Sequence, residues 1–267
     1  MKKIIIGTIV LLTFFENTHA ACTYKFDASP TQIHNMTRNK TLKIFPKIIE
    51  QNFSFRLEGE DDKSNIYRAA SSKAAEEFSS HTYDFVGDKS IPLSGKIGIE
   101  FLVNDFVNKY DRAHSLEKLN MIGTGFSFIL SDDHKYLNYG DISVNDERVT
   151  RHIGVMIQGN NPNKSNFLMG ENYEISKDSI KEIRFGLIID QDNKKIDVNI
   201  NGDYKGSIAS LSGKPTKISL FVDGYSTNIE PKNPFIGQTI SAELITDQSN
   251  MKLNYKVGTT DLCGSPL

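Results

Sequence analysis

The chain has 267 residues, with 31 basic and 33 acidic side chains and a formal net charge of −2. Hydrophobic residues make up 38% of it, and it contains 19 Gly, 8 Pro, 2 Cys and no Trp. The balanced charge offers no basic surface for nucleic acid or an anionic membrane. The Gly, Pro and Cys content excludes collagenous, Pro/Gly-rich disordered and disulfide-dense chains.

The first segment, residues 1–20, has the pattern of a signal peptide. Two lysines precede an apolar run at residues 4–15, which is too short to span a bilayer. Thr18-His19-Ala20 suits a cleavage site, so the mature chain is expected to begin at residue 21 with no transmembrane segment after it. The alternatives are an uncleaved anchor, which the polar residues after the run disfavour, and a lipoprotein, which would need an aliphatic residue in place of His19. We therefore expect export through the inner membrane, to the periplasm, the outer surface or the medium.

The two cysteines, Cys22 and Cys263, lie near opposite ends of the expected mature chain. An exported protein meets an oxidising compartment, and an even number of cysteines favours pairing. We expect a disulfide that brings the two ends of the domain together. Two free, buried thiols are the alternative.

The body of the chain shows recurrent alternation of apolar and polar residues, which predicts antiparallel strands with one buried face. The predicted strands cover residues 53–57, 97–101, 126–130, 155–157, 185–189, 196–200, 218–222, 240–244 and 253–257. Turn residues at 190–193 and at Asn201-Gly202 predict hairpins. Helix is scarce: residues 65–80 suit either one helix or an irregular strand with a long loop, and residues 115–119 suit a single turn.

These features predict an all-β protein, with residues 21–267 forming a single antiparallel β-sandwich and at most one or two short helices. Residues 183–208 resemble the back-to-back strands of concanavalin A-like jelly rolls, which include laminin G-like and legume-lectin-like domains. Residues 90–103 and 242–257 resemble the early and closing strands of that fold. As a whole, the chain also resembles uncharacterised exported proteins of Gram-negative bacteria, and that resemblance implies no activity.

Catalytic patterns of the kind this fold can carry are missing from the sequence. Glycosidases of this architecture place paired carboxylates on one strand, whereas the acidic segment 58–62 has the composition of a solvated loop. Gln32-Ile33-His34 matches part of a polysaccharide lyase pattern, but no arginine-rich strand precedes it. The sequence therefore favours a protein without enzymatic activity and leaves a divergent enzyme as an alternative.

Polar loops provide the candidate ligand and metal sites. Calcium prefers six to eight oxygen ligands, and Asp132, Asp133 and Asp141 of the predicted loop 132–141 are the candidate calcium ligands; these residue types also simply form turns. Sugars stack on aromatic rings, and with no Trp the tyrosines in or beside polar loops are the candidate platforms, although a tyrosine there can instead be a structural plug. The expected ligand-binding residues are Tyr136, Asn138, Tyr139, Asn160, Asn161, Asp223 and Tyr225.

Three functions follow from these observations. The first is an exported lectin-like or adhesin-like binding module that recognises a glycan or a cell-surface partner. The second is a divergent secreted hydrolase or lyase that degrades glycans. The third is a structural or assembly protein of the cell envelope that binds another protein through an exposed sheet edge.

Overall fold

The computed structural model describes ten stretches of the chain, and all structural statements concern them. They are residues 22–36, 42–58, 64–79, 87–104, 121–133, 136–147, 150–159, 167–175, 182–227 and 236–267. The predicted signal peptide and the predicted turn at residues 115–119 lie outside the described residues.

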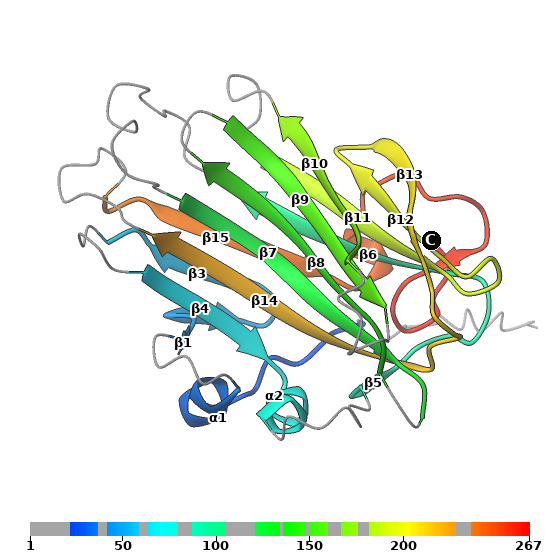
Figure 1. Cartoon of the computed structure of the whole chain (residues 1–267), viewed down its shortest axis with the longest axis horizontal. Coiled ribbons are helices and arrows are strands. Elements are labelled where there is room, and N and C mark those ends of the chain that lie inside the picture. The colour runs from blue at the N-terminus through cyan, green and yellow to red at the C-terminus, as the bar shows by residue number, and fades with distance from the viewer. Residues whose placement is uncertain are drawn as a thin grey trace, which may run out of the picture.

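Two eight-stranded sheets lie one over the other and form a β-sandwich (Figure 1). Sheet A has the order β1-β4-β14-β7-β8-β9-β10, with β5 beside β14. Its strands are β1 (Leu42–Ile44), β4 (Ser64–Ala70), β5 (Lys89–Ser90), β7 (Met121–Ser131), β8 (Tyr136–Glu147), β9 (Thr150–Gly159), β10 (Phe167–Ile175) and β14 (Lys217–Thr227).

Sheet B has the order β13-β12-β11-β6-β15-β3-β2, with β16 beside β6. Its strands are β2 (Lys47–Ile49), β3 (Asn52–Arg56), β6 (Lys96–Asn104), β11 (Glu182–Asp190), β12 (Lys195–Ile200), β13 (Asp203–Ser210), β15 (Thr239–Ile245) and β16 (Thr259–Thr260). Among the described strands, the pairs are antiparallel except β1–β4 and β16–β6. The predicted all-β sandwich is confirmed.

The core lies between the two sheets and is built by the inward residues of the alternating strands. Phe126 of sheet A contacts two rings of sheet B, with centroids 5.6 Å from Phe101 and 5.8 Å from Phe185. Large aromatic side chains dominate the energy of such a core, and truncation of Phe126 to Ala would cost about 3–5 kcal/mol. Beside this cluster, Gly140 on β8 leaves room for the Phe128 ring, because a Cβ there would lie 2.1 Å from Phe128 Cζ.

The predicted hairpin between β12 and β13 is confirmed at Asn201-Gly202. Both residues have positive φ, 51° and 89°, as the tight turn requires. The Asn201 side chain also accepts a hydrogen bond from the Arg184 amide at 2.8 Å. The turn is therefore fixed to the neighbouring strand β11 as well as by its own backbone.

Two short helices lie beside β1 and β4. Helix α1 (Pro30–Asn35) starts with Pro30 after Ser29, whose side chain forms a capping box with Gln32. The single helix proposed for residues 65–80 is wrong: the first part is strand β4, and helix α2 (Ser72–Ser79) follows it. The reason is that residues 64–70 alternate between the two faces of sheet A, which is a strand period rather than a helical one.

The strand predicted at residues 253–257 is also wrong. The amides of Lys252 and Leu253 donate to the Glu100 carboxylate, at 3.0 and 2.8 Å, instead of joining a strand ladder. The Tyr255 hydroxyl donates to the same carboxylate at 3.0 Å, and the missing Cβ of Gly98 leaves space for its ring. Residues 251–267, here called the C-terminal segment, thus cross the outer face of sheet B.

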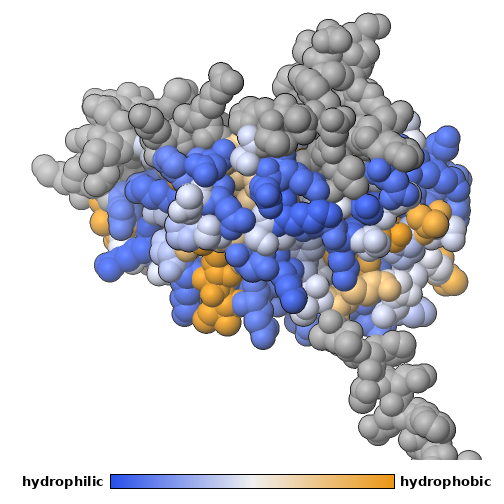
Figure 2. Space-filling model, turned by 90° about the horizontal axis from the view of Figure 1, so that it is seen from below, coloured by the Kyte–Doolittle hydropathy of each residue, from blue (hydrophilic) through white to orange (hydrophobic). Residues whose placement is uncertain are grey.

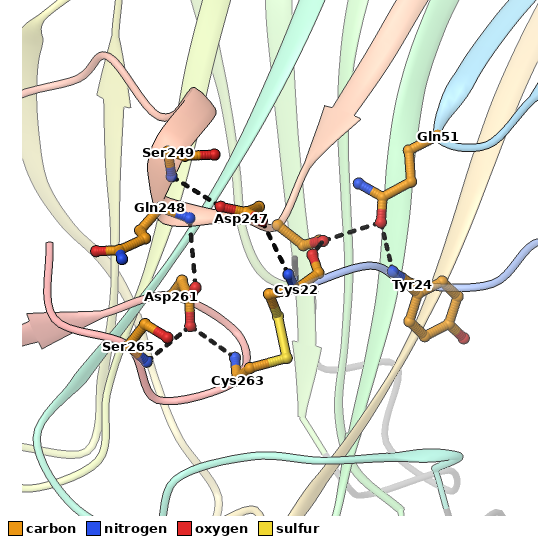
Figure 3. Close-up of a disulfide and its surroundings, with 10 residues drawn as sticks. Cys22, Tyr24, Gln51, Asp247, Gln248, Ser249, Asp261, Cys263 and Ser265 are labelled. Atoms are coloured by element: carbon orange, nitrogen blue, oxygen red, sulfur yellow. Dashed lines mark hydrogen bonds between the residues drawn. A yellow bond between two sulfur atoms is a disulfide. The ribbon is translucent and has the colours of Figure 1, made fainter. Parts of the chain in front are cut away.

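The predicted disulfide is confirmed and joins the first described residue to the C-terminal segment (Figure 3). Cys22 and Cys263 are 241 residues apart in sequence, with their Cα atoms 5.7 Å apart. Asp247 accepts from the Cys22 amide and Asp261 accepts from the Cys263 amide, both at 2.9 Å. The half-buried carboxylate of Asp247 and the buried carboxylate of Asp261 therefore each hold the backbone on one side of the disulfide.

The side of the molecule that lies at the bottom of Figure 1 is mostly hydrophilic, and its hydrophobic patches are small and separate (Figure 2). In the described part of the chain, neither helix is long and apolar enough to cross a membrane.

Candidate functional site

A group of polar side chains gathers on the outer face of sheet A and is here called the polar cluster. Its members are Arg68, Ser127, Tyr139, Asp141 and Asp223. They come from β4, β7, β8 and β14, which are neighbours in the sheet. Side chains alternate along a strand, and the residues next to them in sequence are buried in the core between the sheets, so the polar cluster points away from that core.

An ion pair forms one half of the polar cluster. Arg68 Nε lies 2.6 Å from Asp223 Oδ1, and Arg68 Nη2 lies 3.0 Å from Asp223 Oδ2. The pairing is bidentate, which fixes the plane of both side chains. The Arg68 guanidinium also lies 5.8 Å from the centroid of the Phe221 ring, beneath helix α2. Burial alone would lower the pKa of Arg68, but the charge of Asp223 raises it, so Arg68 keeps its positive charge.

The second carboxylate, Asp141, sits across Ser127 from the ion pair. Ser127 Oγ lies 3.0 Å from Asp141 Oδ2 and 2.9 Å from Asp223 Oδ2. Burial raises the pKa of Asp141 to about 6, and the charge of Asp223 adds to this rise. Burial likewise raises the pKa of Tyr139 to about 12, so its hydroxyl keeps its proton near neutral pH.

The Ser127 hydroxyl carries one proton and therefore can donate to only one of the two carboxylates at a time. When it donates to Asp223, it is free to accept from a protonated Asp141 or from Tyr139, whose hydroxyl lies 3.4 Å away. Because the pKa of Asp141 is about 6, the proton count of the polar cluster changes close to neutral pH. The cluster offers donors and acceptors whose balance depends on pH.

Two further side chains border the polar cluster on the same face. The Tyr225 ring lies over Gly123, where a Cβ would be 2.2 Å from Tyr225 Cζ. On the other side, Met156 of β9 is the cross-strand partner of Asp141 and is half-buried. An aromatic ring and an apolar side chain thus flank a set of fixed polar groups.

The structure brings together Tyr139, Asp141 and Asp223 of the residues singled out from the sequence, with Tyr225 on the same face. Asn138 instead points into the molecule with 0% exposure, and its Oδ1 accepts from the Ser212 amide at 3.0 Å. Asn160, Asn161 and the side chain of Tyr136 lie outside the described residues. The predicted loop 132–141 is wrong in part, since strand β8 begins at Tyr136.

The three candidate calcium ligands do not share one place. Asp141 belongs to the polar cluster, while Asp132 and Asp133 follow the end of β7, where Asp133 Oδ1 lies 3.5 Å from Lys217 Nζ. In the stretches of chain that the structure describes, no group of three or more His, Cys, Asp or Glu side chains could hold a metal ion. The calcium site stays a prediction.

Two members of the polar cluster were missed in the sequence. Arg68 lies in the segment given above as a candidate helix, so its place on a sheet face was hidden. Ser127 alternates with Phe126 and Phe128, and this outward position was the available signal for it. Alternation identifies an outward residue but says nothing about which strands lie beside it.

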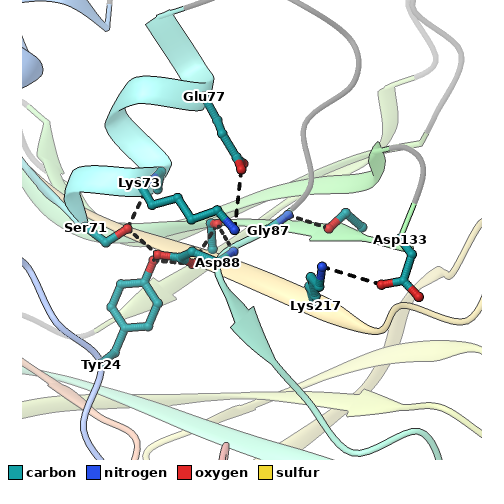
Figure 4. A network of polar contacts seen from close by, with 11 residues as sticks. Tyr24, Ser71, Lys73, Glu77, Gly87, Asp88, Asp133 and Lys217 are labelled. Carbon is teal, nitrogen blue, oxygen red and sulfur yellow. Dashed lines mark hydrogen bonds and ion pairs between the residues drawn. The ribbon is translucent and has the colours of Figure 1, made fainter.

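A second polar network surrounds Asp88 and holds the chain together near helix α2 (Figure 4). Asp88 accepts from the hydroxyls of Tyr24, Ser71 and Ser219, with the Tyr24 bonds at 2.8 and 2.9 Å and the Ser219 bond at 2.9 Å. Burial raises the pKa of Tyr24, which therefore remains a donor. The network joins the N-terminal segment, the start of helix α2 and strand β14. All three hydroxyls are engaged with Asp88, so the network acts as a structural anchor.

Comparisons with known proteins show similarity at the level of the fold. One similar solved structure is an endo-1,3-beta-glucanase from Streptomyces sioyaensis, with 11% identity over 72% of this chain and 74% of that chain and a TM-score of 0.43. A legume lectin-like domain from Entamoeba histolytica has 15% identity over 75% of this chain and 84% of that chain, with a TM-score of 0.40. The alginate lyase AlyC3 has 13% identity over 72% of this chain and 71% of that chain, with a TM-score of 0.37. The likeness concerns the fold alone. No curated protein matches the chain. Residues 5–265 match the family described as "Domain of unknown function (DUF4882)".

Proposed function

We propose that this chain, which belongs to the family described as "Domain of unknown function (DUF4882)", is an exported binding module without enzymatic activity that recognises a glycan through the polar cluster. The observation that carries the proposal is the set of rigidly held donors and acceptors between Tyr139 and Tyr225 on one sheet face. Sugars present neighbouring hydroxyls that each donate and accept, and a few fixed polar groups beside aromatic rings match them.

The engagement of Asp223 favours binding over hydrolysis. Glycosidases need two carboxyl groups that both face the scissile bond. Here both oxygens of Asp223 contact Arg68, and the Ser127 hydroxyl occupies the space between Asp223 and Asp141. Asp223 therefore has both of its oxygens engaged before any glycan binds, which disfavours it as a second catalytic carboxyl group.

A glycan-degrading hydrolase is the second candidate, and one observation supports it. A general acid works best with a pKa near the working pH, and the pKa of Asp141, about 6, meets this condition. In this alternative Asp141 is the proton donor and Asp223 is the second carboxyl group. The two candidates predict different outcomes for the same glycan, namely retention or cleavage.

The envelope-assembly alternative finds little support at one of the two edges of sheet B. Strand β13 forms that edge, and its pairing with β12 has two register irregularities. It also carries Lys205, and bulges and lysines are the usual devices that prevent a further strand from pairing. Addition of a partner strand at β13 is therefore disfavoured.

A glycan array tests the proposal, probed with the oxidised protein in the presence of calcium and, separately, of a chelator. Any retained glycan is then titrated against wild type, Tyr139→Phe and Asp141→Asn, with Asp203→Asn on the opposite sheet as the matched control. We expect both cluster variants to bind on the order of tenfold more weakly, about 1.4 kcal/mol, and the control to bind as wild type does.

Three results would count against glycan binding by the polar cluster. They are an array without any retained glycan, cluster variants that bind as tightly as wild type, and release of shorter saccharides that stops in Asp141→Asn. The last of these would establish the hydrolase instead.

A further inference from the structure

A pocket of about 270 Å³ lies on the outer face of sheet B, between the β12–β13 hairpin and the C-terminal segment. Strand β12 contributes Asp197 and Asn199, strand β13 contributes Tyr204, and the C-terminal segment contributes Asn254 and Lys256. The pocket is on the opposite sheet from the polar cluster, so the inference below does not depend on the proposed function.

Two buried oxygen atoms of residues that line this pocket have no hydrogen-bond partner within the described part of the chain. Asp197 Oδ2 accepts from the Tyr204 hydroxyl at 2.5 Å, but no described group donates to Asp197 Oδ1 or to Asn199 Oδ1. The two residues are only 6% and 1% exposed. Buried polar atoms are nearly always hydrogen-bonded in folded proteins. The two acceptor oxygens lie on one face of the same strand, and their missing partners indicate that a bound molecule with hydrogen-bond donors completes the site.

The charges around the pocket narrow the class of ligand. Lys96 and Lys256 also line it, and Lys256 Nζ lies 4.3 Å from the centroid of the Tyr204 ring. Two ammonium groups disfavour a cationic ligand, whereas a free carboxylate oxygen disfavours an anionic one. A neutral ligand with several hydroxyl groups suits both, since each hydroxyl donates to an acceptor and accepts from an ammonium group.

The size of the pocket sets a limit on that ligand. Pockets for drug-sized molecules range from about 300 to 1,000 Å³, so a pocket of about 270 Å³ suits one small molecule. The Tyr204 ring, which is 42% exposed, stands at its wall and provides an apolar surface. A single sugar ring combines this size with an apolar face and several hydroxyls.

We propose that this pocket binds a small neutral polyhydroxylated ligand, of the size of one monosaccharide, whose hydroxyls donate to Asp197 Oδ1 and Asn199 Oδ1. The two acceptors select hydroxyl donors, the lysines select against cations, and the C-terminal segment forms the outer wall. The disulfide holds that wall in place, because Cys263 belongs to the same segment.

Amide chemical shifts of the ¹⁵N-labelled, oxidised protein test the proposal. D-glucose, D-galactose, D-mannose and glycerol are titrated separately. We expect at least one of them to cause saturable shifts in residues 195–204 and 254–259 without shifts in the strands of the polar cluster. Asp197→Asn and Asn199→Ala remove one acceptor each, and either should weaken the binding by about tenfold.

Two further variants guard against a loss of folding. Asn254→Trp changes an exposed residue of the pocket wall and should block the pocket while the rest of the spectrum stays unchanged. Asp203→Asn, exposed in the same hairpin, should bind as wild type does. If none of the four probes shifts the pocket amides, or if the shifts persist in Asn254→Trp, the proposal is overturned.

Discussion

Replacement of Asp141 by Asn should stabilise the protein above neutral pH and remove one part of its pH dependence. Asp141 is half-buried in the polar cluster, and burial together with the charge of Asp223 raises its pKa from 3.8 to about 6. An ionised Asp141 is therefore less favourable in the folded protein than in the unfolded chain. The folded state carries this cost whenever the pH is above about 6.

The sign of the pH effect follows from proton binding. Between about pH 6 and pH 4 the folded protein binds the Asp141 proton and the unfolded chain does not, so this residue makes the protein more stable as the pH falls through that window. Each pH unit of difference in pKa corresponds to about 1.4 kcal/mol. The rise from 3.8 to about 6 then amounts to about 3 kcal/mol as an upper figure, and partial exposure reduces it to about 1–3 kcal/mol.

Urea unfolding of wild type and Asp141→Asn at several pH values between 4 and 8 measures this cost. The difference between the two proteins isolates Asp141, because other titrating groups contribute equally to both. We expect the variant to exceed wild type by about 1–3 kcal/mol at pH 8 and to lose that advantage by pH 4. Asp203→Asn, whose side chain is 70% exposed, should show no such trend. A variant that is less stable than wild type at pH 8, or a difference that does not change with pH, would refute the reasoning.

Three other perturbations have expected outcomes that follow from single contacts. Reduction of the disulfide should lower the free energy of unfolding by up to about 5 kcal/mol, because the bridge closes a very long loop. Urea unfolding with and without reductant measures the difference, and equal unfolding midpoints would contradict this expectation. Arg184 is buried and lies 2.5 Å from a Glu100 carboxylate oxygen, and Glu100→Gln leaves it only the more exposed Glu182, 3.5 Å away, as an ion-pair partner. A loss of up to about 3–5 kcal/mol in the free energy of unfolding is expected, and a loss below 1 kcal/mol would refute it. Asp197→Asn should lower the pKa of Tyr204 from about 12 toward 10, because the hydrogen bond to Asp197 is the main cause of the rise. An ultraviolet pH titration, with Tyr204→Phe to identify the Tyr204 signal, measures this pKa. An unchanged pKa would exclude that hydrogen bond.

The parts of the fold that were predicted correctly are those where one face of a strand is continuously apolar. Strands β7 and β11 each carry a row of apolar residues at alternate positions that fills the core between the sheets, namely Phe126, Phe128 and Leu130 in β7 and Phe185, Leu187 and Ile189 in β11. The disulfide was predictable for a different reason, since an exported chain with two cysteines has one possible internal pair. Each strand was predicted from its own residues alone, and the disulfide was predicted from the two cysteines alone.

The polar cluster could not be predicted in the same way, because it depends on strand order. Arg68 and Asp223 are 155 residues apart in sequence and meet only because β4 pairs with β14. Nothing in either segment specifies the other as its neighbour. The same holds for Glu100 and the C-terminal segment, where three donors replace the strand predicted at residues 253–257.

Strand β8 carries two residues of the polar cluster, yet its first residues were predicted to be a loop. Its outward positions carry Tyr139 and Asp141, and its inward position between them is Gly140, whose space is filled by the Phe128 ring of the adjacent strand. Gly140 has no side chain of its own, so the apolar alternation is broken at this position. Residues 136–141 were therefore predicted as part of a loop. The preceding inward residue, Asn138, is polar and fully buried, so neither inward position of this stretch gives an apolar signal. The strand signal at residues 136–141 is therefore lost on the inner face, while the polar cluster lies on the outer face.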